Sequence, residues 1–439
     1  MDRHDELFAT AARVLGGAFG QFALPEEDAI VASHGTGAYL YDLRGRRYLD
    51  YLLGSGPLLL GHARPEVVAA IQTQAAKGSH FYVLSEPGIE LAERIVDIVP
   101  CAEKIKYASS GSESTFQALR MARAFSGKTK ILKFEGGFHG THDYAMMSSF
   151  HSSPDGFPHP APDSTGIPDA IRDTVLVSRW NDRELTRSLV ERHAHELAVV
   201  VCEPMQRAVV AAPGFLQFLR ELTEEHGLLL MFDEMVTGFR LALGGGQQRY
   251  GVVPDLATFG KAMTNGMAMT CIAGRSDVLA VADVARAGSD SYSYFGGTLN
   301  GHALAAAAGL AVLGVLSGPG VYERLDQMGD TLRHGLREAA ARHGLPAQVL
   351  GEGPVFQIVF TETPVVDFET LVTGDRARSR EFGLGCLRAG ILNNGGGKFY
   401  ISLAHSDVDL ATTLEVFDQV LAGMAAERAP ARQAATSTL

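Results

Sequence analysis

The sequence is poor in features that would indicate a disulfide scaffold, a zinc module or a nucleic-acid binder. Its 439 residues include only four cysteines, scattered at Cys101, Cys202, Cys271 and Cys386, with no CxxC pair. This spacing indicates neither a disulfide framework nor a zinc site, and it fits a reduced, cytoplasmic protein in which Cys202, within the apolar run LAVVVCEP, is a buried free thiol. The net charge of −12 at pH 7 argues against nucleic-acid binding, which needs a basic surface.

Long apolar runs are also missing. The longest, ALAAAAGLAVLGVL at 303–316, falls short of the about 20 residues that a bilayer requires, and it predicts a buried helix instead. The N-terminal MDRHDELFATAARVLGG is too charged for a signal peptide. We therefore expect no membrane segment, and apolar and charged contents of 46% and 20% are those of a globular protein.

An alternation of apolar strands and helices occupies residues 61–315. Within it, LAVVVCEP and LLLMFDE read as buried strands, and FLQFLRELTEEHG reads as the amphipathic helix between them. Such alternation predicts an α/β fold with a mostly parallel central sheet that is covered by helices. Ligands bind at the carboxyl ends of the strands in sheets of this kind.

The segments on either side of residues 61–315 differ from them in sequence pattern. Residues 1–60 contain a hairpin in which AYLYD and RYLDYL flank the turn-prone LRGR, and we expect this N-terminal segment to join the small domain. Residues 316–425 predict a smaller α+β domain, beginning with a long amphipathic helix. The last residues, 426–439, have little to bury, and we predict that they are disordered. The chain is thus expected to form a large domain, a small domain and a tail.

The motif SSGSES, containing Ser110, Gly111 and Ser112, stands between a predicted strand and a predicted helix. Backbone N–H groups, hydroxyls and the helix dipole at such a position favour a phosphate group. The same residues are equally compatible with an ordinary serine N-cap. Thr298, after two glycines and before a helix, is a second candidate phosphate contact, with helix capping again as the alternative.

Two charged residues lie in largely apolar stretches. Asp233 ends the apolar strand LLLMFD, so its carboxylate needs a partner such as a protonated ring nitrogen, although it could also cap the next helix or pair with Arg240. Lys261 follows Gly260 among apolar residues and methionines, where a desolvated amine becomes a nucleophile that can form a Schiff base. A lysine whose head reaches solvent is the alternative. Together with a phosphate cradle, these are the groups that pyridoxal 5′-phosphate requires.

The motifs in their order resemble those of class III pyridoxal-phosphate aminotransferases, and especially of glutamate-1-semialdehyde aminomutase and its relatives. The motifs that carry this resemblance are SSGSEST, KFEGGFHGTHD, CEPM, FDEMVTGFR, FGKAMTNGM and FGGTLNGHALAAAAG. The resemblance implies a fold type I enzyme that works as a homodimer on a small-molecule amino donor and a carbonyl acceptor. It also implies that the cofactor is pyridoxal 5′-phosphate.

Matching position by position, the resemblance implies that Lys261 holds the cofactor as a Schiff base and that Asp233 pairs with its ring nitrogen. The remaining implied contacts are Ser110, Gly111 and Ser112 to the phosphate, Thr298 to the phosphate from the partner subunit, Phe138 stacked on the ring, His139 beside it and Glu203 near it. Phe138 and His139 are also compatible with plain turn residues, and Glu203 with a helix cap. His139 and His142 stand three apart, but no third ligand is implied, so we predict no metal site.

Differences from the family pattern bear on the reaction. Where transaminases that use 2-oxoglutarate carry a late arginine, FYISLAHSD has Ser402 and so resembles the branch of aminomutases and β-amino-acid transaminases. The glutamate of the aminomutase is missing upstream, where NNGGGKFYIS offers Lys398 instead. We therefore favour an aminotransferase. An intramolecular aminomutase is the alternative, and a non-catalytic binding subunit is a third hypothesis that the retained lysine and aspartate weigh against.

Overall fold

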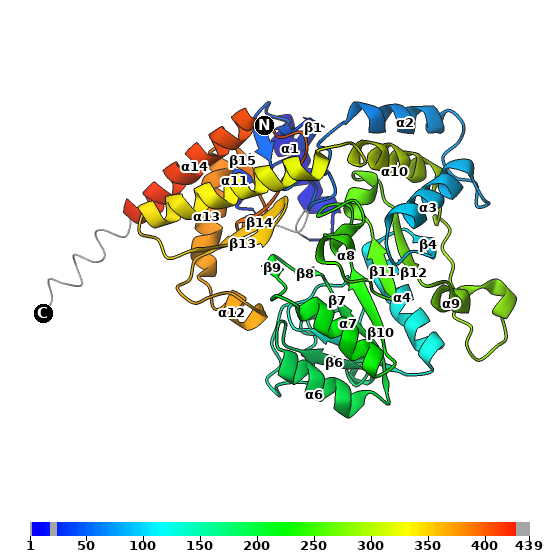
Figure 1. Cartoon of the computed structure of the whole chain (residues 1–439). Coiled ribbons are helices and arrows are strands. Elements are labelled where there is room, and N and C mark those ends of the chain that lie inside the picture. The colour runs from blue at the N-terminus through cyan, green and yellow to red at the C-terminus, as the bar shows by residue number, and fades with distance from the viewer. Residues whose placement is uncertain (1, 18–23, 427–439) are drawn as a thin grey trace, which may run out of the picture. The chain divides into compact units, whose positions relative to one another are not determined.

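The computed structural model describes residues 2–17 and 24–426, and the chain divides into two compact units (Figure 1). The larger unit comprises residues 65–322 and 365–371, and the smaller one comprises residues 1–64, 323–364 and 372–439. The tail that we predict to be disordered lies outside the described residues, apart from its first residue.

A seven-stranded sheet in the order β4-β12-β11-β10-β7-β5-β6 forms the centre of the larger unit. Its strands are β4 (Lys104–Ala108), β5 (Lys130–Phe134), β6 (Val175–Ser178), β7 (Leu197–Cys202), β10 (Leu229–Asp233), β11 (Leu256–Phe259) and β12 (Thr270–Gly274). Only β12 runs antiparallel to its neighbours, so the predicted mostly parallel sheet is confirmed. Strands β7 and β10 are buried along their whole length, as their unbroken apolar sequences require.

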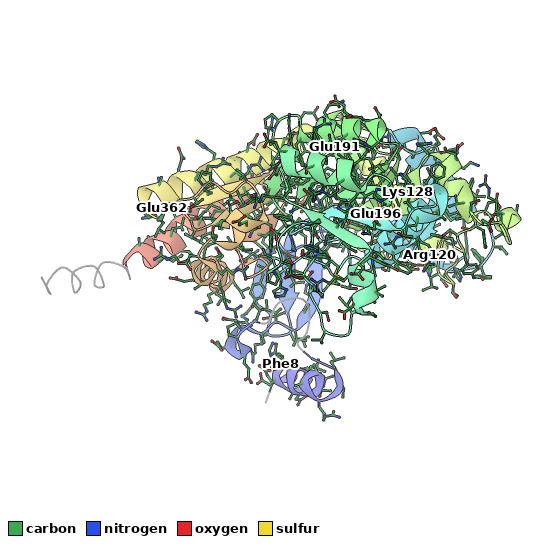
Figure 2. The ribbon with its side chains drawn as sticks, turned by 90° about the horizontal axis from the view of Figure 1, so that it is seen from below. Phe8, Arg120, Lys128, Glu191, Glu196 and Glu362 are labelled. Carbon is green, nitrogen blue, oxygen red and sulfur yellow. The ribbon has the colours of Figure 1, made fainter. Side chains whose placement is uncertain are left out.

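Helices cover this sheet and connect its strands. They are α2 (Pro65–Ala75), α3 (Glu86–Ile98), α4 (Gly111–Ser126), α5 (Asp169–Arg172), α6 (Arg183–His193), α7 (Phe215–Glu225), α8 (Gly245–Tyr250), α9 (Ser276–Leu279) and α10 (Ala303–Leu316). Helices α6 and α7 pack side by side (Figure 1). Helix α10 is mostly buried against α2 and α3, as its sequence predicts. Charged side chains such as Glu191 of α6 project into solvent (Figure 2).

The smaller unit contains two sheets. One has the order β1-β2-β3-β15, with β1 (Ala32–Thr36), β2 (Tyr39–Asp42), β3 (Arg47–Asp50) and β15 (Ile391–Leu392). The other consists of β13 (Gln348–Glu352), β14 (Val355–Val359) and β16 (Lys398–Tyr400). Strands β2 and β3 pair antiparallel, which confirms the predicted hairpin. The helices are α1 (Arg3–Val14), α11 (Val321–Arg342), α13 (Arg376–Arg388) and α14 (Asp407–Ala426).

Aromatic side chains form the core of the smaller unit. The rings of Phe356 and Phe399 stack with centroids 4.9 Å apart, and Phe382 and Phe417 pack edge-on or tilted around them. Such a cluster buries a large apolar area and so stabilises the unit.

In the part of the chain that is described, no single helix is long and apolar enough to cross a membrane. Helices α10 and α11, which are bent by 79° relative to each other, reach that length and apolar character only when they are taken together.

Candidate active site

One edge of the large sheet collects most of the predicted site residues. Strands β4 and β11 both run antiparallel to β12, so they are parallel to each other, and β11, β10, β7 and β5 are parallel in turn. The carboxyl ends of these strands therefore lie at one edge. The predicted residues end these strands or follow them directly, namely Ser110 after β4, Lys261 after β11, Asp233 ending β10, Glu203 after β7, and Phe138 and His139 after β5.

Ser110 forms the N-cap of α4. Its hydroxyl accepts a hydrogen bond from the backbone N–H of Glu113 at 3.2 Å, so the capping interpretation is correct. The backbone N–H groups of the first two helical residues, Gly111 and Ser112, have no acceptor among the described residues. They stand at the positive end of a helix of 16 residues, which is a favourable position for an anion. Capping and phosphate binding are therefore compatible here.

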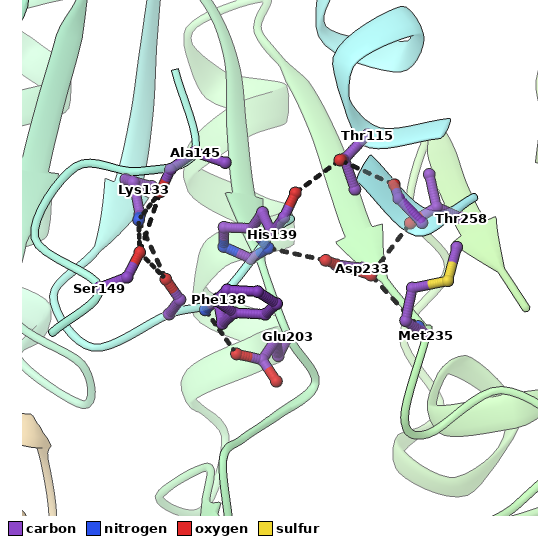
Figure 3. A network of polar contacts seen from close by, with 12 residues as sticks. Thr115, Lys133, Phe138, His139, Ala145, Ser149, Glu203, Asp233, Met235 and Thr258 are labelled. Atoms are coloured by element: carbon purple, nitrogen blue, oxygen red, sulfur yellow. Dashed lines mark hydrogen bonds and ion pairs between the residues drawn. The ribbon is translucent and has the colours of Figure 1, made fainter. Parts of the chain in front are cut away.

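Asp233 is the centre of a buried polar network (Figure 3). Its Oδ2 lies 2.9 Å from Nδ1 of His139, and its Oδ1 accepts hydrogen bonds from the Thr258 hydroxyl at 3.1 Å and from the Met235 N–H at 3.2 Å. Thr258 is the register partner of Asp233 across β10 and β11, which explains their contact. These contacts from three directions fix the orientation of the buried carboxylate.

Glu203 and Thr115 hold the segment that carries Phe138 and His139 (Figure 3). The carboxylate of Glu203 accepts a hydrogen bond from the Phe138 N–H at 3.0 Å, and the Thr115 hydroxyl donates to the His139 carbonyl at 2.5 Å. Glu203 therefore binds backbone in the Phe138 segment and does not act as a helix cap. Nε2 of His139 is buried and has no hydrogen-bond partner in the described structure.

Lys261 begins a single 3-10 turn (Lys261–Thr264) after β11, with φ of 42°. Its side-chain amine has no hydrogen-bond or ion-pair partner among the described residues. The preceding Gly260 is tightly enclosed, because an added Cβ would lie 2.7 Å from Thr270 Cγ2 and 2.8 Å from Met235 Sδ. The expectation of a buried lysine is not met: Lys261 is partly exposed, although the flanking Phe259, Ala262 and Met263 are buried.

Thr298 lies apart from these residues in the loop that precedes α10. It is exposed, and α10 begins after His302 as its N-cap, so Thr298 does not cap that helix. The loop approaches the SSGSES motif at Asn300, whose Oδ1 accepts a hydrogen bond of 3.4 Å from the Ser109 hydroxyl. The structure thus brings the other predicted site residues to one edge of the sheet, whereas Thr298 forms no hydrogen bond or ion pair among the described residues.

Sequence reasoning missed several residues of this network. Thr258 and Thr115 sit in apolar or helical sequence, and only the register of β10 and β11 reveals the first as a partner of Asp233. Lys133, in the strand sequence KILKF, is fully buried, and its amine contacts the loop that carries Phe138 (Figure 3). Burial lowers the pKa of Lys133 to about 7, because the charged amine loses its hydration.

Comparison with known proteins agrees with this geometry. The family described as Aminotransferase class-III matches residues 23–421, and the chain belongs to that family. A relative, the glutamate-1-semialdehyde 2,1-aminomutase of Methanothermobacter thermautotrophicus, is 38% identical over 96% of this chain and 99% of its own. A second aminomutase, from Brevibacillus brevis, is 37% identical over 96% of this chain and 98% of its own.

Solved structures show the same fold. An omega-transaminase from Sphaerobacter thermophilus superposes with a TM-score of 0.89 at 32% identity, covering 96% of this chain and 97% of the other. A β-phenylalanine aminotransferase from Variovorax paradoxus gives a TM-score of 0.85 at 29% identity, covering 96% and 94%. The protein is therefore a pyridoxal-phosphate-dependent enzyme of fold type I, in a family that contains both aminotransferases and aminomutases.

The groups at the sheet edge fit this cofactor. Two backbone N–H groups at the start of α4 have no acceptor among the described residues and could bind a phosphate. The amine of Lys261 has no partner there either and could react with an aldehyde. The buried carboxylate of Asp233 could pair with a protonated ring nitrogen. The enclosed Gly260 leaves no room for a side chain directly before the lysine.

Proposed function

We propose that the protein is an aminotransferase that moves an amino group from an amine or amino-acid donor to a carbonyl acceptor, with Lys261 as its covalent anchor for the cofactor. The observation that carries this proposal is the unpartnered amine of Lys261 at the same sheet edge as the buried, hydrogen-bonded Asp233. The omega-transaminase of Sphaerobacter thermophilus, with its TM-score of 0.89, supports it further.

Each residue has a separate task in this proposal. Pyridoxal phosphate supplies an aldehyde and an electron-withdrawing ring. Lys261 Nζ binds it and afterwards takes a proton from the donor substrate and returns it. Asp233, oriented by Thr258 and His139, keeps the ring nitrogen protonated through its negative charge.

The remaining contacts position the cofactor. Ser110, Gly111 and Ser112 bind its phosphate at the start of α4, where the helix dipole favours negative charge. Phe138 covers one face of the ring, with its backbone fixed by Glu203. Stacking and phosphate binding together hold the reacting atom at a constant position relative to Lys261.

An intramolecular aminomutase is the second candidate function. It is favoured by relatives named glutamate-1-semialdehyde 2,1-aminomutase that are 37–38% identical over nearly the whole chain. The same Lys261 and Asp233 would serve both reactions. The two candidates differ in whether a second substrate is needed, because a mutase returns the amino group to the molecule that donated it.

A panel of α-, β- and ω-amines, with an aminosugar and glutamate 1-semialdehyde included, separates the two candidates. Aminotransfer predicts that a donor abolishes the visible absorbance of the lysine-bound cofactor and releases a carbonyl product, and that turnover stops without an acceptor. Isomerisation of one compound with no acceptor would instead establish the mutase. The variant Lys261→Ala, incubated with the same cofactor, should show neither the band nor turnover.

We further propose a homodimer in which Thr298 reaches the cofactor of the partner subunit. Apolar side chains on the larger unit support an interface: Phe81 is 44% exposed, Tyr82 77%, Val83 75%, Leu84 87% and Leu299 51%. An exposed cluster of this kind marks an interaction surface. A self-complementary dimer is the most common way to cover one, and Thr298 stands next to Leu299 in it.

Mixing two defective variants tests this arrangement. Lys261→Ala removes the covalent anchor, and Thr298→Ala weakens phosphate binding. If Thr298 serves the partner's site, each mixed dimer has one site with both defects and one intact site, so tight cofactor binding returns on mixing. If the mixture binds only as the average of the two variants, Thr298 does not act across an interface. Light scattering on the wild-type protein establishes the number of chains.

We place the protein in the cytoplasm. All four cysteines are free and buried, which supports a reducing environment. Fractionation of cells that express the tagged protein would test this, and recovery outside the cytoplasm would refute it.

A further inference from the structure

Lys133 is a fully buried lysine whose amine binds neutral acceptors. It is the penultimate residue of β5 and has no exposed surface. Its Nζ lies 3.0 Å from the Gly137 carbonyl, 2.9 Å from that of Ala145 and 2.6 Å from that of Met147. Among the described residues no carboxylate forms an ion pair with it. Three of the acceptors around this amine are thus main-chain carbonyls.

A hydroxyl completes this cluster. Ser149 Oγ lies 2.9 Å from Lys133 Nζ and also 2.9 Å from the carbonyls of Gly137 and Ala145 (Figure 3). All four groups that contact Lys133 belong to one segment, residues 137–149. The lysine therefore holds the two ends of this segment together around a single nitrogen. Buried polar groups that lose such partners are costly to leave unpaired.

The segment that Lys133 gathers carries Phe138 and His139. Phe138 is the neighbour of Gly137, whose carbonyl accepts from Lys133, and its own N–H is held by Glu203. His139 follows, with Nδ1 on Asp233. A shift of the Gly137 carbonyl would therefore move both residues, because only one or two peptide units separate them from it.

Arg207 braces the same segment from another element. Its Nε donates to the Gly136 carbonyl and its Nη2 to the Ser149 carbonyl, both at 2.8 Å. Its guanidinium also lies 5.8 Å from the centre of the Phe138 ring, within the range of a cation–π contact. Lys133 and Arg207 thus both donate to main-chain carbonyls in or next to this segment, and of the two only Lys133 is fully buried.

We propose that Lys133 is a positioning residue for the cofactor site, which acts by holding the segment 137–149 so that Phe138 covers the cofactor ring and His139 orients Asp233. The inference rests on the proposed function, because it uses those roles of Phe138 and His139. It adds a residue that touches neither cofactor nor substrate and that reaches the site only through backbone carbonyls.

The test compares Lys133→Met with Lys130→Met. Methionine keeps the length and volume of the lysine but donates no hydrogen bond. Lys130 lies on the same strand, and its amine pairs with Glu196 at 3.1 Å; Glu196 is labelled in Figure 2. Because this pair is not part of the Lys133 cluster, Lys130→Met should leave the site unchanged. Far-ultraviolet circular dichroism and the fluorescence of the single tryptophan, Trp180, establish that each variant is folded.

Three readouts follow the proposed role. Hydrogen exchange of peptides from residues 136–149 in cofactor-free protein should become faster in Lys133→Met alone. Affinity for pyridoxal phosphate should fall by about tenfold, the loss expected for one charged hydrogen bond. The pH midpoint of the absorbance of the lysine-bound cofactor should shift, because His139 no longer fixes Asp233. A merely structural role would change the first readout without the other two, and would overturn the proposal.

A second variant covers the case in which Lys133→Met does not fold. Ser149→Ala removes only the hydroxyl of the cluster, and it should shift the same pH midpoint away from the wild-type value; no shift would overturn the proposal. If wild-type protein formed no lysine-bound absorbance band, the site assignment would fail. If it formed the band and Lys133→Met matched Lys130→Met in affinity and midpoint, only the role of Lys133 would fail.

Discussion

Replacing Asp233 by asparagine tests the electrostatic part of the site. The side chain keeps its shape and can still accept hydrogen bonds from Thr258 and Met235, but it loses its charge. A hydrogen bond to a charged group contributes about 1.5–3 kcal/mol, so affinity for pyridoxal phosphate should fall by about 10- to 150-fold. Titration of the apoprotein, followed by absorbance, measures this loss. Turnover should fall as well, because a neutral asparagine does not keep the ring nitrogen protonated.

Asp255 provides a matched control. It is also buried, but it precedes β11 and so lies at the opposite edge of the sheet, where it pairs with Arg220 at 2.9 Å and Arg275 at 2.8 Å. Asp255→Asn should lower the free energy of unfolding by about 1–3 kcal/mol, since both pairs are partly screened by solvent, and leave cofactor affinity unchanged. Equal effects of the two substitutions on cofactor affinity, or none from Asp233→Asn, would refute the reasoning.

The remaining predictions concern the support of the site and the stability of the two units. Glu203→Ala should weaken cofactor binding by about fivefold, because the Phe138 N–H loses its acceptor, whereas Glu203→Gln keeps an acceptor oxygen and should bind within about twofold of wild type in the same titration. Gly260→Ala should lower the free energy of unfolding by about 1–3 kcal/mol, because its Cβ would meet Met235 Sδ at 2.8 Å; chemical denaturation that showed no loss would contradict the packing described. Burial lowers the pKa of His405 to about 4, so its contribution to stability is present above the unfolded pKa of 6.5 and is lost as pH falls towards 4. The unfolding temperature should therefore change less between these pH values in His405→Gln than in wild type. Equal changes in the two proteins would contradict a role of His405 in the pH dependence of stability.

Much of the large sheet could be predicted from sequence, because its central strands are apolar without interruption. Strands such as β7 and β10 have no competing periodicity, and the residues directly after them become candidates for the site by the rule that ligands bind at carboxyl ends. This rule pointed to Asp233, whereas Glu203 was implied only by the resemblance to the family. The rule also pointed to Lys261. The apolar neighbours wrongly suggested that this lysine is fully buried, because burial depends on where a turn directs each side chain and not only on the neighbouring residue types.

The parts of the site that could not be predicted depend on register and on backbone carbonyls. Thr258 contacts Asp233 only because β11 pairs with β10 at that residue, and no local pattern reveals the register of parallel strands. From the sequence, Lys133 resembles any lysine in a strand. Its partners are main-chain carbonyls, which every residue has, so no residue type in the sequence indicates them. Ser402, which the sequence marks as a difference from transaminases that use 2-oxoglutarate, contacts His405 in the smaller unit at 3.0 Å.

Chemical trapping of the cofactor is the most direct test of the central claim, that Lys261 binds pyridoxal phosphate covalently. The protein is incubated with the cofactor and reduced with borohydride, and the labelled peptide is identified by mass spectrometry. The account predicts one labelled residue per chain, Lys261, and no label in Lys261→Ala. A label on Lys133, Lys398 or any other lysine of the wild-type protein, or no label at all, would contradict it.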